Sequence, residues 1–365
     1  MRSRITTEVM QSLRSLKEWR RMEQGMKLTG ESGRTYVIGG ESWMLPEHMR
    51  FAKDIHNEQL SFHVKQPQKK KSISLDYNVG RELRSFGKEL RMNEIFNGAN
   101  FLWQQVDTIL PTFDSETEPP RVVYEAMWKT IFEARTMRTF TRREVKLIMR
   151  STLLALQEIE RKGFVHTNLT TEYLLLPTEK LDLCKPEEFF AKITNTASCS
   201  VPSQVHKVDW RQPSSFHAPE MYFSKPVSFP AHIWSWAMIL SHLLESRAAL
   251  KSGRFESAFI GSMFETWNLP RNNYSNQGQI LFGELVCHFN VDFCEYFADC
   301  DMPDYEPCEE SDWKEHMRNK GVLDEDICFL DWILDPNPET RPTSEQIIET
   351  GFLEWNEDDV EEEES

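Results

Sequence analysis

Apolar and polar residues follow two different patterns in the two parts of the chain. Before about residue 134 they alternate in short stretches, as in "LSFHVKQPQ", where Phe62 and Val64 lie on one face of a strand of period two. Strands are predicted over residues 34–45, 60–68, 101–110 and 120–128. Apolar residues at helical spacing predict one helix over 77–96. The N-terminal portion is therefore expected to be small and rich in strands.

Beyond residue 134 the pattern changes to that of helices. Residues 142–163 form a strongly amphipathic helical pattern that ends at Gly163, and residues 229–246 are apolar on nearly all sides, which is typical of a buried helix. The chain is thus expected to be an α+β protein with a smaller strand-rich lobe and a larger helical lobe. The domain is predicted over 34–355, with lobes at about 34–125 and 126–355.

The two ends of the chain differ from this domain. Residues 1–33 are predicted to be an N-terminal extension that is helical, because Val9, Leu13 and Leu16 recur at helical spacing. Residues 356–365, "NEDDVEEEES", have no apolar periodicity and are predicted to be a solvated, disordered acidic tail.

Charge and cysteine content narrow the class of protein. The net charge of −16 argues against binding nucleic acid, which requires a basic face, and no apolar run approaches the roughly 20 residues that span a bilayer. The cysteines lack CxxC spacing, which indicates reduced thiols in the cytoplasm or nucleus. Cys294, Cys300 and Cys308 lie close enough in sequence to leave a metal site open, although idle thiols are the favoured interpretation.

Five short sequence motifs follow one another along the chain. They are "FVHTNLTTEYLLL" (164–176), "AKITNTA" (191–197), "FHAPE" (216–220), "HIWSWAMIL" (232–240) and "LDPNPETRPTSEQII" (334–348). In this order they resemble the catalytic loop, the D-F-G word, the A-P-E word, the central helix and the late arginine turn of eukaryotic protein kinases. The resemblance covers roughly residues 36–352 and implies the bilobal protein-kinase-like fold.

The residues that carry out chemistry in that family are replaced here. The resemblance puts Asn168 at the position of the catalytic-loop Asp, and an amide has no basic oxygen to take up a proton. Tyr173 stands at the position of the metal-binding Asn, and Asn195 at that of the D-F-G Asp. A phenol is bulky and a poor ligand for magnesium, and at Asn195 a neutral carbonyl replaces a carboxylate, so magnesium is doubtful as a cofactor.

Supporting parts of the family pattern have changed as well. Thr167 replaces the Arg of the catalytic loop, and His232 replaces the Asp that ties this loop to the buried helix. Residues 36–46 contain only Gly39 and Gly40 where the family has a glycine-rich loop, so less backbone is free to cradle phosphates.

Other family positions are retained. Lys65 matches the strand lysine that pairs with nucleotide phosphates, with Glu89 as its expected helix partner and Glu82 as second choice. A candidate ATP pocket follows from the resemblance, with ATP as a candidate cofactor; it comprises Lys65, Glu89, Tyr124, Glu125 and Met127. Structural roles are expected for His166, Glu220 and Arg341, the last two as a buried ion pair.

These replacements favour one function over two others. The leading hypothesis is a pseudokinase that binds or scaffolds a protein partner, with residual ATP binding left open. An atypical active serine/threonine kinase is the first alternative, with Glu172, Asp182 or Asp209 supplying the missing carboxylate. A nucleotide sensor that binds ATP without metal and stabilises one arrangement of the lobes is the second.

Overall fold

The computed structural model describes residues 20–40, 48–67, 75–111, 118–138, 140–177, 189–202, 216–223, 225–251, 289–301 and 313–354. The chain forms two compact units. The N-terminal unit comprises Met1–Lys129, Leu175–Asp182 and Lys192–Ala197, and the C-terminal unit comprises Thr130–Leu174, Leu183–Ala191 and Ser198–Ser365. The expected lobe boundary at 125/126 is thus a few residues early, and two later segments return to the N-terminal unit, which no local pattern indicates.

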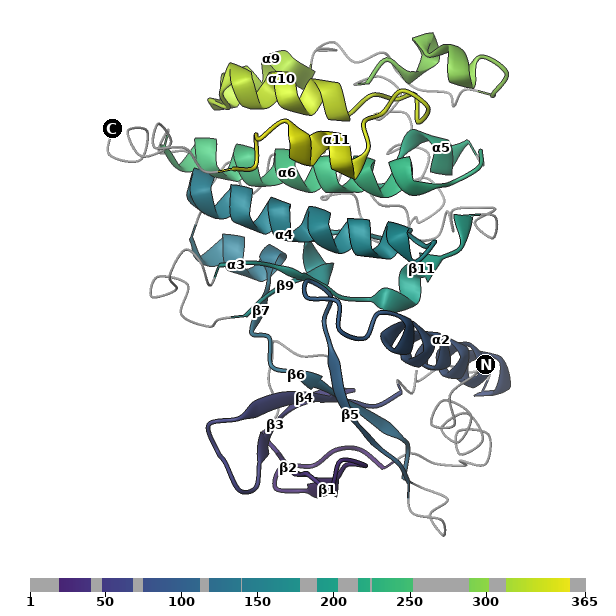
Figure 1. The fold of residues 1–365 in the computed structure, drawn as a ribbon, viewed down its shortest axis with the longest axis vertical. Coiled ribbons are helices and arrows are strands. Elements are labelled where there is room, and N and C mark those ends of the chain that lie inside the picture. The colour runs from purple at the N-terminus through teal and green to yellow at the C-terminus, as the bar shows by residue number, and fades with distance from the viewer. Residues whose placement is uncertain are drawn as a thin grey trace. The chain divides into compact units, whose positions relative to one another are not determined.

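The N-terminal unit is built on a six-stranded antiparallel sheet in the order β1-β2-β3-β4-β6-β5 (Figure 1). Its strands are β1 (Lys27–Thr29), β2 (Thr35–Ile38), β3 (Met49–Asp54), β4 (Ser61–Lys65), β5 (Gln105–Ile109) and β6 (Arg121–Glu125). One helix of this unit, α2 (Leu75–Ile95), follows β4 in the chain. Each strand pairs with its neighbour in antiparallel register.

Two sequence expectations are wrong in this sheet. Residues 27–29 form strand β1, so the extension 1–33 is not helical throughout; residues 1–19, which carry the helical spacing, lie outside the described part. Only Leu28 of β1 is buried, and three residues are too few to show a period of two. The strand expected over 34–45 ends at Ile38, where two glycines follow, and strand β3 was not predicted.

The turn between β1 and β2 is fixed by a carboxylate on β5. Asp107 accepts hydrogen bonds from the backbone N–H and the hydroxyl of Ser32 and, at 2.8 Å, from the hydroxyl of Tyr36. A Cβ atom at Gly30 would lie 2.0 Å from Asp107 Oδ2, so this position requires glycine. Burial, and then the hydrogen bond to Asp107, raise the pKa of Tyr36 far above its usual range.

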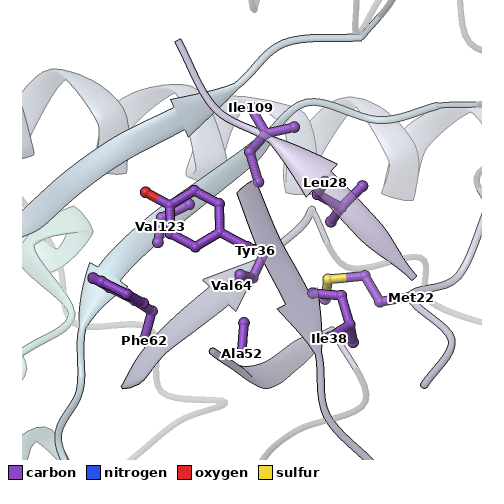
Figure 2. Close-up of a cluster of buried hydrophobic side chains, with 9 residues drawn as sticks. All are labelled: Met22, Leu28, Tyr36, Ile38, Ala52, Phe62, Val64, Ile109 and Val123. Carbon is purple, nitrogen blue, oxygen red and sulfur yellow. The ribbon is translucent and has the colours of Figure 1, made fainter. Parts of the chain in front are cut away.

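The two faces of the sheet bury different clusters. One cluster, drawn in Figure 2, comprises Met22, Leu28, Tyr36, Ile38, Ala52, Phe62, Val64, Ile109 and Val123. The other joins the sheet to α2 and comprises Phe86, Leu90, Trp103, Val122, Tyr124 and Met127. Because successive side chains of a strand alternate between faces, Phe62 and Val64 of β4 belong to the first cluster, while His63 and Lys65 lie on the second face.

Five short strands form two further, smaller sheets among the described residues. The strands β7 (Lys129–Thr130), β9 (Leu174–Leu176) and β10 (Lys192–Ile193) form a sheet in the order β10-β9-β7, and the chain passes from one unit to the other within β7 and within β9. In the C-terminal unit, β8 (Val165–His166) pairs antiparallel with β11 (Cys199–Ser200).

Helices make up most of the C-terminal unit. They are α3 (Ile131–Met137), α4 (Arg142–Arg161), α5 (Pro219–Tyr222), α6 (Phe229–Lys251), α9 (Trp313–Lys320), α10 (Asp324–Ile333) and α11 (Ser344–Glu349). The helices α4 and α6 pack on each other, and the indole N–H of Trp236 donates to the carbonyl of Met149 at 2.9 Å. Helix α4 begins at a capping box formed by Thr141 and Glu144, and Gly163 follows its end with φ of 80°. None of the helices in the described ranges is long and apolar enough to cross a membrane.

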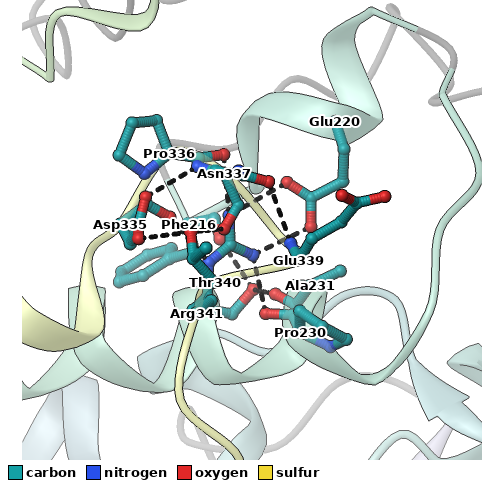
Figure 3. Close-up of polar contacts among 11 residues, drawn as sticks. Phe216, Glu220, Pro230, Ala231, Asp335, Pro336, Asn337, Glu339, Thr340 and Arg341 are labelled. Carbon is teal, nitrogen blue, oxygen red and sulfur yellow. Dashed lines mark hydrogen bonds and ion pairs between the residues drawn. The ribbon is translucent and has the colours of Figure 1, made fainter. Parts of the chain in front are cut away.

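A buried arginine joins α5 to the turn before α11. The guanidinium of Arg341 forms two hydrogen bonds with the carboxylate of Glu220, at 2.9 and 3.2 Å, and donates to backbone carbonyls, including that of Pro230 (Figure 3). The side chains of Arg341 and Glu220 are 0% and 1% exposed. Arg341 also lies over the ring of Trp234, 5.0 Å from its centroid. The structure therefore brings together the pair that the sequence suggested.

Candidate functional site

The N-terminal unit contains a lysine–glutamate pair at its centre. Lys65 is the last residue of β4, and Glu89 lies on α2. The ammonium group of Lys65 donates to both carboxylate oxygens of Glu89, at 2.7 and 2.8 Å. Their side chains are only 20% and 10% exposed, so the pair is partly shielded from solvent. The side chain of Glu82, the second choice from sequence, lies outside the described residues.

This pair is the start of a buried polar network. The hydroxyl of Tyr124 donates to Glu89 Oε1 at 2.7 Å, and the amide of Asn93 donates to the Tyr124 oxygen at 2.7 Å. Thr196 in turn donates to Asn93 Oδ1 at 3.1 Å. Burial, and then the charge of Glu89, raise the pKa of Tyr124 well above its usual value, so the phenol stays protonated and can donate. Helix α2 is thereby linked to the segment that contains Asn195.

Asn93 and Thr196 were not predicted as members of this site. Asn93 lies four residues after Glu89 and therefore on the same face of α2, which is a signal the sequence offers. Thr196 is at the position where the family has the Phe of D-F-G. Its hydrogen bond to Asn93 could not be predicted from sequence, because the fold brings these two distant residues together.

We expect Tyr124→Phe to lower the free energy of unfolding by about 1–3 kcal/mol, because it leaves buried groups of Glu89 and Asn93 without their partner. Denaturant unfolding followed by tryptophan fluorescence measures the change. Tyr296→Phe, at a half-exposed position of the C-terminal unit, is the matched control and should change the stability by less than about 0.5 kcal/mol. Equal effects of the two substitutions would contradict a stabilising network.

Asn195 keeps an unusual backbone conformation. Its φ is 54°, in the left-handed region, and its side chain is half-buried. Asn and Asp are the side chains that adopt this region most readily after glycine. The residue thus holds the turn before Thr196 but brings an uncharged amide to it.

In the C-terminal unit, the other two degenerate positions lie next to each other. The side chain of Asn168 lies beside Tyr173, where it acts to lower the pKa of that phenol. Burial, and then the nearby charge of Glu172, raise the pKa of Tyr173, so the phenol is neutral at physiological pH. An amide and a protonated phenol at these positions present neither a proton acceptor of suitable basicity nor a carboxylate ligand.

The loop that carries Asn168 is held in place by other side chains. The hydroxyl of Thr167 donates to the carbonyl of Ser198 at 2.9 Å. The backbone N–H of His166 donates to Nδ1 of His232 at 3.4 Å, so the proton of this imidazole is assigned to Nε2, which lies 2.7 Å from Glu160 Oε1. A histidine therefore retains the connection between loop and buried helix that the family makes with Asp.

The proposed stand-in carboxylates and metal ligands find little support among described residues. Glu172 is exposed, and Asp182 and Asp209 lie outside the described part of the chain. Within that part, no group of three or more His, Cys, Asp or Glu side chains is arranged to hold a metal ion. Cys294 and Cys300 are free thiols, and Cys308 lies outside the described part. At the family's two magnesium positions Tyr173 offers a bulky phenol and Asn195 an uncharged amide in place of a carboxylate, which is a poor fit for that cation.

The segment Glu125–Trp128, here called the hinge segment, is bonded to side chains of its own unit. The indole N–H of Trp103 donates to the carbonyl of Glu125 at 3.0 Å. The carboxylate of Glu125 accepts from Lys192 at 2.6 and 2.7 Å. The carbonyl of Met127 is bonded to Nε2 of His63. Of these, His63, Trp103 and Lys192 were not predicted, although His63 precedes Lys65 by two residues and so shares its strand face.

Comparison with known families agrees with this geometry. The sequence model of the protein kinase domain matches residues 59–353, so the chain belongs to the protein kinase family. The expected α+β fold with its strand-rich N-terminal region and helical C-terminal part is confirmed. The match begins just before β4 and excludes β1, β2 and β3. A comparison with curated proteins found no match.

Proposed function

We propose that this member of the protein kinase family is a pseudokinase, a non-catalytic domain that binds or scaffolds a protein partner. The observation that carries the proposal is that neutral side chains, Asn168 and Tyr173, lie beside each other at the positions of the catalytic base and of a metal ligand. The pKa of the Tyr173 phenol is raised, so it carries no charge for a metal ion. The scattered free thiols suit a role in the cytoplasm or nucleus.

The size of the chemical loss supports this proposal. Removal of a general base alone costs about 10²–10⁴ in rate. Phosphoryl transfer depends mainly on electrostatic positioning by metal ions, and Asn195 supplies an uncharged amide at the second metal position. The two effects together remove the main sources of rate enhancement in this family.

The purified protein is expected to transfer no phosphate from ATP, with magnesium or manganese, beyond the level of Lys65→Ala. Incorporation of labelled phosphate into itself and into generic protein substrates is the measurement, with an intact kinase as positive control. Metal-dependent transfer by the wild type that is lost in a folded Lys65→Ala variant would favour the active-kinase alternative. Loss of that transfer in Glu172→Ala would then identify the replacement carboxylate.

The nucleotide-sensor alternative has one observation in its favour. The pairing of Lys65 with Glu89 is the arrangement that places a lysine for nucleotide phosphates in this family. Binding of ATP without metal, detected as a thermal shift that EDTA leaves unchanged, would favour it. The alternative also requires that the adenine base of ATP has a place to bind in the N-terminal unit.

A further inference from the structure

The part of the N-terminal unit that a base would occupy lies on one face of the sheet. On β3, β4 and β6 the residues Phe51, His63 and Tyr124 are in register with one another. Lys65 lies on the same face two residues further along β4, and its partner Glu89 lies on α2. A base-binding site typically combines apolar and aromatic walls with a few backbone hydrogen-bonding groups. Here the backbone groups belong to the hinge segment.

The imidazole of His63 takes one of these backbone groups. His63 is 2% exposed, and its Nε2 atom is bonded to the carbonyl of Met127, a residue that is itself 2% exposed. Because a carbonyl only accepts, Nε2 must carry the proton, and in the neutral ring the lone pair is then on Nδ1. Within the described residues, Nδ1 has no hydrogen-bond partner. Burial lowers the pKa of His63 to about 4, in agreement with a neutral ring.

Aromatic rings surround this imidazole. The ring of Phe51 lies 4.5 Å from that of His63, and the ring of Trp128 stacks on Phe51 at 5.3 Å. Trp103 meets His63 edge-on at 5.6 Å and stacks on Tyr124 at 4.0 Å. The same Trp103 donates to the carbonyl of Glu125. The imidazole of His63 is therefore a planar heterocycle that lies among aromatic rings and is hydrogen-bonded to the hinge backbone, as a bound base would be.

We propose that His63 is an internal ligand of the base-binding site implied by the kinase fold: its imidazole occupies the site and takes the Met127 carbonyl, so that the native chain binds no adenine nucleotide. Removal of the imidazole opens a site for a small planar nitrogen heterocycle with one N–H donor, the chemical class of azoles. The residues of the family's ATP pocket thus do not fit ATP here.

The test is chemical complementation of His63→Ala in the full chain. This variant is expected to melt at a lower temperature than the wild type, because it leaves a cavity and an unpaired carbonyl. Millimolar 4-methylimidazole, as the neutral base in mildly alkaline buffer, should raise its melting temperature by roughly 2–4 °C. The wild type should not shift with 4-methylimidazole, adenosine or ATP, whether or not magnesium is present.

Val64→Ala is the matched control, since it opens an apolar cavity at the next residue but on the other face of β4. It should be destabilised but not rescued by 4-methylimidazole. Equal rescue of both variants, or none of His63→Ala, would overturn the proposal, as would a shift of the wild type with adenosine or ATP.

A second measurement does not depend on whether the variant folds. In the wild-type protein, ¹⁵N NMR of the histidine side chains should show His63 as the Nε2–H tautomer with slow solvent exchange of that proton. An Nδ1–H tautomer, or rapid exchange, would contradict an internal hydrogen bond to the hinge. The inference is independent of catalysis: a chain that binds ATP yet transfers no phosphate would overturn it and leave the proposed pseudokinase function intact.

Discussion

Glu220→Ala is expected to lower the free energy of unfolding of the C-terminal unit by about 3–5 kcal/mol. The substitution leaves the guanidinium of Arg341 as an unpaired charge in a site where both side chains are almost fully buried. The remaining backbone acceptors of Arg341, such as the carbonyls of Pro230 and Asp335, satisfy its N–H groups but do not neutralise it. Denaturant unfolding followed by the fluorescence of the buried Trp234 and Trp236 measures the loss.

The control for this prediction is an exposed pair on α4. Arg161 and Glu158 form an ion pair with the Arg161 side chain 67% exposed, and Arg161→Ala should leave the stability nearly unchanged. A loss below 1 kcal/mol for Glu220→Ala would mean that water or a rearranged side chain compensates Arg341. Glu220→Gln keeps the hydrogen-bonding shape without the charge and should fall between Glu220→Ala and the wild type.

Acidification from pH 7 to 5 is expected to destabilise the protein by roughly 1–2 kcal/mol for each of its strongly buried histidines. Burial lowers the pKa of His63 and of His217 to about 4, and burial followed by the charge of Arg135 lowers that of His242 to about 3. The unfolded chain, with an ordinary histidine pKa near 6.5, binds these protons first as the pH falls. Stability is therefore full above pH 6.5 and declines steadily below it.

Unfolding curves at several pH values measure this slope. His217→Asn should make the dependence shallower, whereas His56→Asn, at an exposed position, should leave it unchanged. Burial raises the pKa of Asp326, which acts in the opposite direction and reduces the total. A stability that stays constant between pH 7 and 5 would show that these imidazoles reach solvent in the folded protein.

Much of this fold could be predicted from sequence, because long amphipathic or apolar periods dominate it. The helices α4 and α6 and the strand β4 lie where the pattern placed them, within a few residues. The strand β1 was missed because only one of its three residues is buried. The strand β3 was missed because its buried positions hold Arg50, Ala52 and Asp54, so its alternation in burial is not an alternation of apolar and polar residues. The local pattern carried no information on which segments pair, so the return of 192–197 to the N-terminal unit was not foreseen.

In the candidate site, too, some residues could be predicted from sequence and others could not. Some site residues could be selected from sequence because they lie in or near short motifs of the kinase family. These are Lys65, Glu89, Asn168, Tyr173 and Asn195. The bond from His63 to Met127 joins residues 64 positions apart, and that from Thr196 to Asn93 joins residues 103 apart. Such contacts depend on tertiary packing and leave no periodic trace in the sequence.

At Asn195 the left-handed backbone conformation does not depend on the charge of the side chain. Aspartate and asparagine share the ability to adopt this conformation, so an exchange of one for the other alters the electrostatics of the turn and leaves its path almost unchanged. A binding partner that reads the contour of this chain would meet the same contour in a catalytically competent relative. Under the pseudokinase function proposed above, such a partner would be shared with active kinases, and competition for it is the mode of action that this proposal predicts.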